Sequence, residues 1–185
     1  MTTDVELCAR ALTRLGLEPI TSFDGSAEAT VCQRQYPVVR DAYLTEQPWW
    51  FNTKMAALTR LAGTPEAVWE YRFQLPNDFL SLIEIVEPRY LEPYELEGEN
   101  RLLAGVKSVT IRYNARLDES LFPAVFADAL SWRLAADVCL SLTENTERLE
   151  ATSRLFQEAD LRLKTRSAAM QRPQRIRSFP LTAVR

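Results

Sequence analysis

The stretch that decides the fold of this chain is residues 122–142, which read FPAVFADALSWRLAADVCLSL. It is rich in alanine and leucine and contains no glycine, so it predicts one long helix. Pro123 is compatible with the first turn, where a missing backbone N–H costs no intrahelical hydrogen bond. Asp128, Arg133 and Asp137 would be costly in hydrocarbon, so we expect no membrane span.

The polar residues of this stretch divide the helix surface into two apolar strips. At 100° per residue, Asp128 lies on one side, Arg133 and Asp137 lie on the other, and apolar residues fill both gaps. One interpretation is a central core helix on which Arg133 and Asp137 form an exposed i,i+4 ion pair. The other is a helix that contacts its own subunit through one strip and a neighbouring subunit through the second. The sequence leaves both interpretations open.

The composition is typical of one globular domain. The 185 residues are 46% hydrophobic and 25% charged. No apolar segment follows a basic start, so we expect no secretory signal and a protein made in a cytoplasm. Cys8, Cys32 and Cys139 are far apart and lie in helical patterns, which predicts buried thiols rather than a disulfide framework or a zinc site.

The usual signatures of catalytic sites are missing. The chain has no histidine, which is the commonest general base and metal ligand. It also lacks the P-loop, GxGxxG, GxSxG, HExxH and CxxC spacings. We therefore expect no enzyme activity, no cofactor and no metal.

Charge is distributed unevenly along the chain. The formal net charge is −3, but residues 161–185 carry seven basic residues and no acid, which leaves residues 1–160 at −10. The body is therefore acidic and the tail basic. An acidic body is a poor surface for nucleic acid, so we expect only the tail to contact phosphates.

Two helices are predicted in the first quarter of the chain. Thr3 caps a helix over 4–15, and Ser26 caps a second helix that runs to about residue 46. Pro37 falls inside the second pattern. Because proline lacks a backbone N–H and its ring clashes with the preceding turn, we expect a kink or a break near residue 34.

A last helix is predicted over 144–170, with Thr143 as its N-cap. Its apolar residues form a single stripe that includes Leu149, Phe156 and Leu163. We therefore expect this helix to pack back on the central one.

Residues 48–52, PWWFN, form the densest aromatic cluster and end the second helical pattern. Paired tryptophans are able to stack on bases or sugars. The preferred interpretation is a core anchor or an interface plug at the hinge between the helices and the next part of the chain. The candidates for contact with a neighbouring subunit are Trp49, Trp50, Trp132, Arg133 and Asp137.

Between residues 54 and 114 the pattern changes from helical to alternating, with glycine and proline between the runs. Strands are predicted over 68–75, 82–87 and 108–113, with two shorter ones over 58–61 and 102–103. The expected fold class is α+β: a mainly α-helical bundle, formed by residues 1–53 and 115–171, with a small antiparallel β domain inserted over 54–114.

Within the inserted region, residues 84–99 carry six acids opposed only by Arg89: Glu84, Glu87, Glu92, Glu95, Glu97 and Glu99. The aspartate-rich loop with glycine that calcium sites need is absent. We therefore interpret these carboxylates as a solvated acidic face. Such a face would repel phosphates if it lined a passage for DNA, and the candidates for that role are Glu92, Glu95, Glu97 and Glu99.

Residues 172–185, RPQRIRSFPLTAVR, have two prolines, spaced apolar residues and no helical period. They are either a disordered end or an extended arm that becomes ordered on a partner. Both interpretations stay open. The residues that would carry binding by such an arm are Arg172, Arg175, Ile176, Arg177, Phe179, Leu181 and Arg185.

Several pieces, in this order along the chain, resemble the tail tubular protein A family of short-tailed bacteriophages, whose members are head-to-tail adaptors. The order and spacing of the pieces carry the resemblance. They are LGLEPI at 15–20, DGSAEA at 24–29, WWFN at 49–52, LPNDFLS at 75–81, and RLDE at 116–119 leading into FPAVF at 122–126.

The resemblance implies a structural virion protein: a subunit of a ring, dodecameric in the family, that joins the portal to the tail nozzle. Double-stranded DNA would pass through such a ring without specific binding. On the charge argument, the arm over 172–185 would bind an acidic groove of the portal, and the acidic insertion would face the channel or the nozzle. The alternative is a small nucleic-acid-binding accessory protein that acts through the same basic tail.

Overall fold

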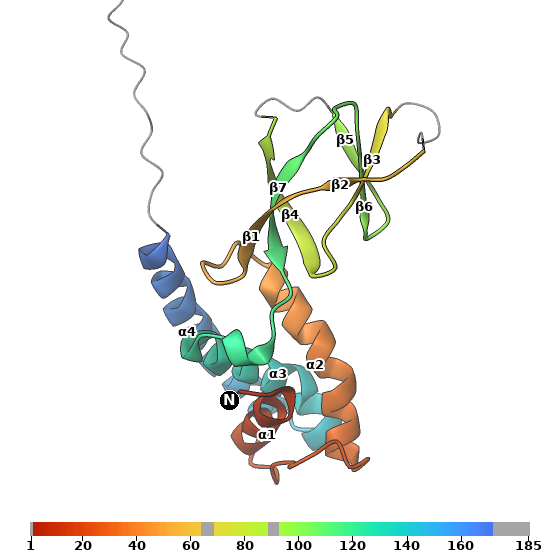
Figure 1. Ribbon diagram of the computed structural model, residues 1–185. Helices are drawn as coiled ribbons and strands as arrows, with labels where there is room; N and C mark the ends of the chain where they lie inside the picture. The colour runs from red at the N-terminus through yellow and green to blue at the C-terminus, as the bar shows by residue number, and fades with distance from the viewer. Residues whose placement is uncertain (1, 64–68, 89–92, 172–185) are drawn as a thin grey trace, which may run out of the picture.

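The computed structural model describes residues 2–63, 69–88 and 93–171. Four helices lie at one end of the molecule and two small antiparallel sheets at the other (Figure 1). The strands are inserted between the second and third helices, so the fold class is α+β, as predicted. None of the helices in the described ranges is both long and apolar enough to cross a lipid bilayer.

The first two helices begin where local capping predicts. The Thr3 and Ser26 side chains accept hydrogen bonds from the backbone N–H groups of Glu6 and Ala29, at 3.2 and 3.3 Å. These bonds satisfy N–H groups that have no partner within the helix. The elements of the helical part are α1 (Asp4–Arg14), α2 (Ala27–Thr45), the short 3₁₀ helix η1 (Glu119–Leu121), α3 (Ala124–Thr143) and α4 (Thr146–Met170).

The sequence predicts a kink or a break near residue 34. Helix α2 runs without interruption through Pro37, so the break is wrong. Tyr36, Val39 and Tyr43 lie on one face of α2 and are buried, and α2 packs on α3. Tertiary packing of an amphipathic face contributes more to helix stability than local propensity does. Here it maintains the helix although Pro37 removes one backbone hydrogen bond.

The turn between α3 and α4 differs from the prediction by two residues. Glu144 has a left-handed backbone with φ 50° and ends α3, and the Asn145 side chain accepts from the Arg148 N–H at 2.9 Å. Asn145 is therefore the N-cap of α4. Thr143 is still helical, and its hydroxyl donates back to the Cys139 carbonyl at 2.7 Å. An N-cap needs a non-helical backbone, which Thr143 does not have.

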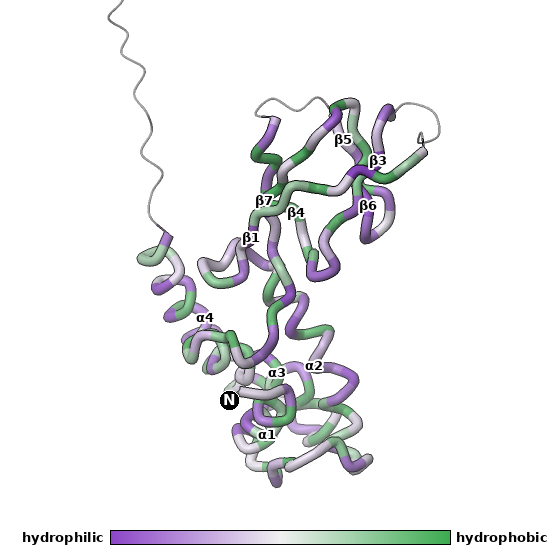
Figure 2. Tube along the Cα trace, viewed as in Figure 1, coloured by the Kyte–Doolittle hydropathy of each residue, from purple (hydrophilic) through white to green (hydrophobic). Residues whose placement is uncertain are grey.

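Helix α3 is the centre of the helical part, with α1, α2 and α4 packed around it. Phe126, Leu130, Leu134 and Val138 are fully buried in one continuous core. Helix α4 packs back on α3 as predicted, and Figure 2 shows hydrophilic and hydrophobic residues alternating along it, as in an amphipathic helix. Cys8, Cys32 and Cys139 are buried free thiols, as expected.

The strands form two sheets rather than one. The first has the order β1-β7-β4 and the second β2-β3-β6-β5, and all pairs are antiparallel. The strands are β1 (Thr53–Ala57), β2 (Thr59–Arg60), β3 (Tyr71–Gln74), β4 (Phe79–Glu87), β5 (Tyr94–Glu97), β6 (Arg101–Ala104) and β7 (Thr110–Ala115). Strand β5 is not among the predicted strands, because its glutamates indicated an acidic surface.

One segment belongs to both sheets. Leu58 separates β1 from β2, and its N–H donates to the Val109 carbonyl at 2.8 Å, while the Leu61 N–H donates to the Arg72 carbonyl at 2.8 Å. Figure 1 shows this segment crossing from one sheet to the other. The strands therefore follow each other in the order β4, β7, β1/β2, β3, β6, β5, and the two outer strands are β4 and β5.

Candidate functional site

Motifs that are scattered along the sequence meet at the junction between helices and strands. Trp49 is fully buried, 5.5 Å from the ring centre of Tyr43, and Phe51 lies 4.8 Å from Phe126. Phe122 and Phe126 are 5.0 Å apart. Edge-to-face aromatic pairs at these distances contribute beyond the area they bury. The aromatic residues of PWWFN and FPAVF thus form one core cluster.

Asn52 fixes the chain where α2 gives way to β1. Its side chain is fully buried, accepts from the Trp49 N–H at 3.2 Å and donates to the Leu44 carbonyl at 3.0 Å. The Trp49 indole N–H donates to the Tyr43 carbonyl at 3.0 Å. These bonds satisfy backbone groups at the end of α2 that would otherwise be buried without partners.

Asp78, just before β4, makes contacts with β1 and β7 at the same junction. Its carboxylate accepts from Lys54 Nζ at 2.7 Å and from the Tyr113 hydroxyl at 2.9 Å, and its carbonyl accepts from the Arg116 N–H at 2.7 Å. Burial alone would raise the pKa of Asp78, but the bonds from Lys54 and Tyr113 lower that pKa below its ordinary value. Burial and the Asp78 carboxylate raise the pKa of Tyr113 to about 12.

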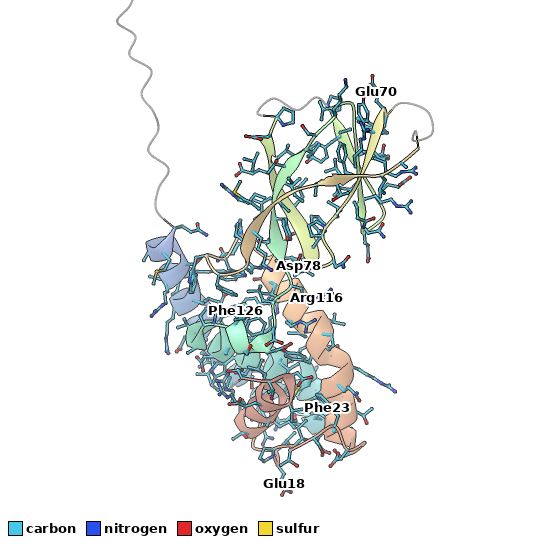
Figure 3. All side chains as sticks on the ribbon, in the orientation of Figure 1. Glu18, Phe23, Glu70, Asp78, Arg116 and Phe126 are labelled. Carbon is cyan, nitrogen blue, oxygen red and sulfur yellow. The ribbon has the colours of Figure 1, made fainter. Side chains whose placement is uncertain are left out.

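Ion pairs attach the strands to α2. Arg116 follows β7, and its Nη2 lies 2.7 Å from Asp41 Oδ2 (Figure 3 labels Arg116 and Asp78 at this junction). Arg40 bridges the Asp41 and Glu119 carboxylates at 2.9 and 2.8 Å, and the Tyr36 hydroxyl donates to Glu119 at 3.0 Å. Because Arg40 and Glu119 are largely buried, these pairs are screened less by salt than surface pairs.

The structure changes the list of subunit-interface candidates. Trp49 lies wholly in the core of its own chain and is not available to a neighbour. The predicted pair between Arg133 and Asp137 does not form: Arg133 pairs with Glu46 and lies over the Tyr43 ring at 4.9 Å, because the end of α2 brings a carboxylate closer.

The other two tryptophans among the interface candidates, Trp50 and Trp132, are half-buried. The Trp132 ring is covered by the Arg14 guanidinium, 4.2 Å from the ring centre, and Arg14 also pairs with Asp128. Trp50 lines a groove with Met170 and Gln171 at the end of α4. Asp137 is exposed on α3. Of the five candidates, Asp137 is therefore the most exposed, and Trp50, Trp132 and Arg133 are half-buried.

The acidic residues of the insertion are less isolated than the sequence suggests. Glu84 pairs with Arg112 of β7, and Glu97 lies 3.1 Å from Arg72 and 3.3 Å from Arg101. Strand pairing brings these arginines close, so the interpretation of a face opposed only by Arg89 is wrong for these two carboxylates. Glu95 accepts from the Trp69 indole at 2.8 Å, and Glu99 is exposed in the turn after β5.

A groove of about 670 Å³ separates β4 from β5. It is lined by Phe79, Leu80 and Leu82 of β4, by Tyr94 and Leu96 of β5, and at one end by Asp41 and Thr45 of α2 with Arg116. The groove is not among the sites predicted from the sequence. The alternation of Tyr94 and Leu96 with glutamates was the available signal for a strand with one apolar face.

Glu92 and the seven candidate arm residues, Arg172, Arg175, Ile176, Arg177, Phe179, Leu181 and Arg185, lie outside the described residues. Within the described ranges no group of three His, Cys, Asp or Glu side chains is arranged to hold a metal ion. No protein-family model matches this chain, and no curated protein matches it.

Proposed function

We propose that this chain is a structural subunit of a head-to-tail adaptor ring in a short-tailed bacteriophage, placed in the virion between the portal and the tail nozzle. The observation that carries the proposal is the ordered set of sequence pieces that resembles tail tubular protein A. Three of these pieces contribute side chains to the junction. WWFN contributes Trp49 and Asn52, LPNDFLS contributes Asp78, and FPAVF contributes Phe122 and Phe126. The resemblance therefore involves residues that hold the helices and the strands together.

Apolar side chains on the outside of the helical part support assembly with other copies. Val38 of α2 and Leu161 of α4 are 64% and 67% exposed, and Leu121 of η1 is 62% exposed. Single exposed apolar residues are common on monomers. On a ring subunit these side chains would be covered by the two neighbouring subunits. As a structural subunit, the protein would have no catalytic role.

The basic tail and the acidic insertion would make two different contacts. The arginines over 172–185 would be attracted to an acidic groove of the portal, and this attraction would speed docking and weaken with salt. The exposed Glu95 and Glu99 would face the channel or nozzle, where they would repel passing DNA.

Electron microscopy of the full chain, alone and mixed with the portal of the same phage, tests the proposal. We expect rings, dodecameric as in the resembled family, seated on the portal. A variant that ends at Met170 should keep its circular dichroism spectrum and lose portal binding. Unchanged portal binding by that variant would rule out a role of residues 172–185 in portal binding. A chain that forms no ring with any portal would refute the adaptor function.

The alternative function, nucleic-acid binding through the basic tail, makes a different prediction. Neutralising several phosphates releases counterions, so affinity for DNA would fall steeply with salt. Titration of the full chain with duplex DNA at a low and a physiological salt concentration distinguishes the two. Tight binding that collapses with salt would favour the alternative, and weak binding at both would favour the adaptor.

A further inference from the structure

The groove between β4 and β5 is an open seam in the β part. Each of these strands has one hydrogen-bonded neighbour among the described residues, β7 for β4 and β6 for β5. Strand β5 pairs with β6 in a regular register from Tyr94 to Glu97, whereas β4 has three register shifts along β7. The free edge of β5 is therefore the more regular template for another strand.

The apolar face that β3, β6 and β5 share continues to the seam, where its last side chains stay exposed. Leu96 is paired with Leu102, and Leu102 with Phe73, so these three side chains share one face. Leu102 and Phe73 are fully buried, but Leu96 remains 42% exposed and Tyr94 46% exposed. On the opposite wall, Phe79 and Leu82 are half-buried. A strand placed in the seam would cover apolar surface on both walls.

We propose that the seam binds residues 172–185 of a second copy of this chain, which add to β5 as an extended strand. The seam would be a contact between subunits of the proposed ring, and it rests on the proposed function only for the closure of these contacts into a circle. The occupant is the basic C-terminal segment of the neighbouring subunit.

The sequence of the segment fits this position. Phe179 and Leu181 are two residues apart, so in an extended chain both side chains point to the same face. If these residues pair with β5, the nitrogen of Pro180 points away from it, and the missing N–H costs no bond to that edge. The added strand would place Phe179 and Leu181 against the exposed apolar layer.

The charges of the seam and the segment are complementary. Strands β4 and β5 carry four glutamates and no basic residue, and the segment carries four arginines and no acid. Among the described residues, Glu99, which lines the groove, has no ion-pair partner, whereas Glu84 and Glu97 are paired. The carboxylate of Glu99 would attract the arginines and select a basic strand.

The position of Gln171, the residue before the segment, favours a neighbour over the same chain. Gln171 Nε2 donates to the Pro48 carbonyl at 2.6 Å, just before β1. Gln171 also lines a groove with Ile83 and Glu84 of β4, and this groove is separate from the seam, which is lined by Phe79 and Leu82. A segment that leaves one copy at the first groove and enters the seam of the next copy makes a head-to-tail contact, and such contacts generate rings when the rotation closes. The seam and the portal would then compete for the same segment.

Self-association of the full chain tests the proposal, measured by sedimentation velocity over a range of concentrations. We expect association that Leu96→Arg and Phe179→Ser each weaken by about tenfold or more, since each removes an apolar contact at the centre of the interface. Met55→Arg is the matched control, because Met55 is 55% exposed on a strand outside the seam. It should associate like the unmodified chain. A full chain that stays monomeric, or seam variants that associate normally, would overturn the proposal.

Cross-linking identifies the occupant directly. Full chains with the paired substitutions Leu96→Cys and Phe179→Cys, or Leu96→Cys and Leu181→Cys, should form disulfide-linked multimers on mild oxidation, since the natural cysteines are buried. A disulfide formed within single chains, or no disulfide in either variant, would overturn binding of a neighbour's segment. Cross-linking without portal binding would refute the adaptor alone, and portal binding by Leu96→Arg with normal self-association would refute the seam alone.

Discussion

Asn52 is the residue that joins the two kinds of secondary structure in this chain. It is fully buried and serves the Trp49 N–H and the Leu44 carbonyl at once. No apolar side chain of similar size replaces a donor and an acceptor together, so its loss leaves two buried backbone groups without partners.

We therefore predict that Asn52→Ala lowers the free energy of unfolding by about 3 kcal/mol. Urea unfolding followed by circular dichroism measures this change. Asn77→Ala is the control, because Asn77 is exposed in the turn before β4, and it should change stability by less than about 0.5 kcal/mol. Equal effects of the two substitutions would show that the Asn52 bonds contribute little.

The lowered pKa of Asp78 predicts that the free energy of unfolding depends on pH. Its pKa is lower in the folded chain than its ordinary 3.8, so the ionised carboxylate stabilises the fold above about pH 4, and this stabilisation is lost as the pH falls below that. Asp78→Asn removes it at every pH. Urea midpoints should differ between the two proteins at pH 6, and the difference should shrink as the pH falls below about 4. The exposed Asp137→Asn serves as control, and a difference for Asp78→Asn that stays constant from pH 6 to pH 3 would contradict the assignment.

At the scale of elements, the start of α4 shows how the end of one helix decides the cap of the next. The left-handed Glu144 ends α3 and places Asn145 in the extended backbone that a cap requires. We predict that Asn145→Ala costs about 1 kcal/mol and Thr143→Ala less than about 0.5 kcal/mol, in the same urea assay. The reverse order would show that Thr143 caps α4.

At the scale of the whole molecule, the junction couples the helical and β parts. The aromatic cluster, the bonds of Asn52 and the ion pair between Asp41 and Arg116 all cross it. We predict one cooperative transition in urea, with coincident curves from circular dichroism and tryptophan fluorescence. The double variant Asp41→Ala, Asn52→Ala should separate the curves. Two transitions in the unmodified chain would mean that the parts fold independently.

Local patterns determined much of this protein from the sequence alone. The caps at Thr3 and Ser26, the long helix that became α3, and the alternating strands near 71–74 and 110–115 depend on neighbours within a few residues. Periodicity and capping are local properties, so a single sequence reveals them. The overall class, helices around an antiparallel insertion, followed from the order of these elements.

Only the tertiary structure decided which residues meet. Arg133 pairs with Glu46 across 87 positions, and Arg116 with Asp41 across 75, although closer partners in the sequence were available. Strand β5 and the seam beside it depend on β1 and β2 passing from one sheet to the other, which no local pattern encodes. Long-range packing also kept α2 continuous through Pro37. These contacts join distant segments, so their partners follow from the folded backbone and not from spacing along the chain.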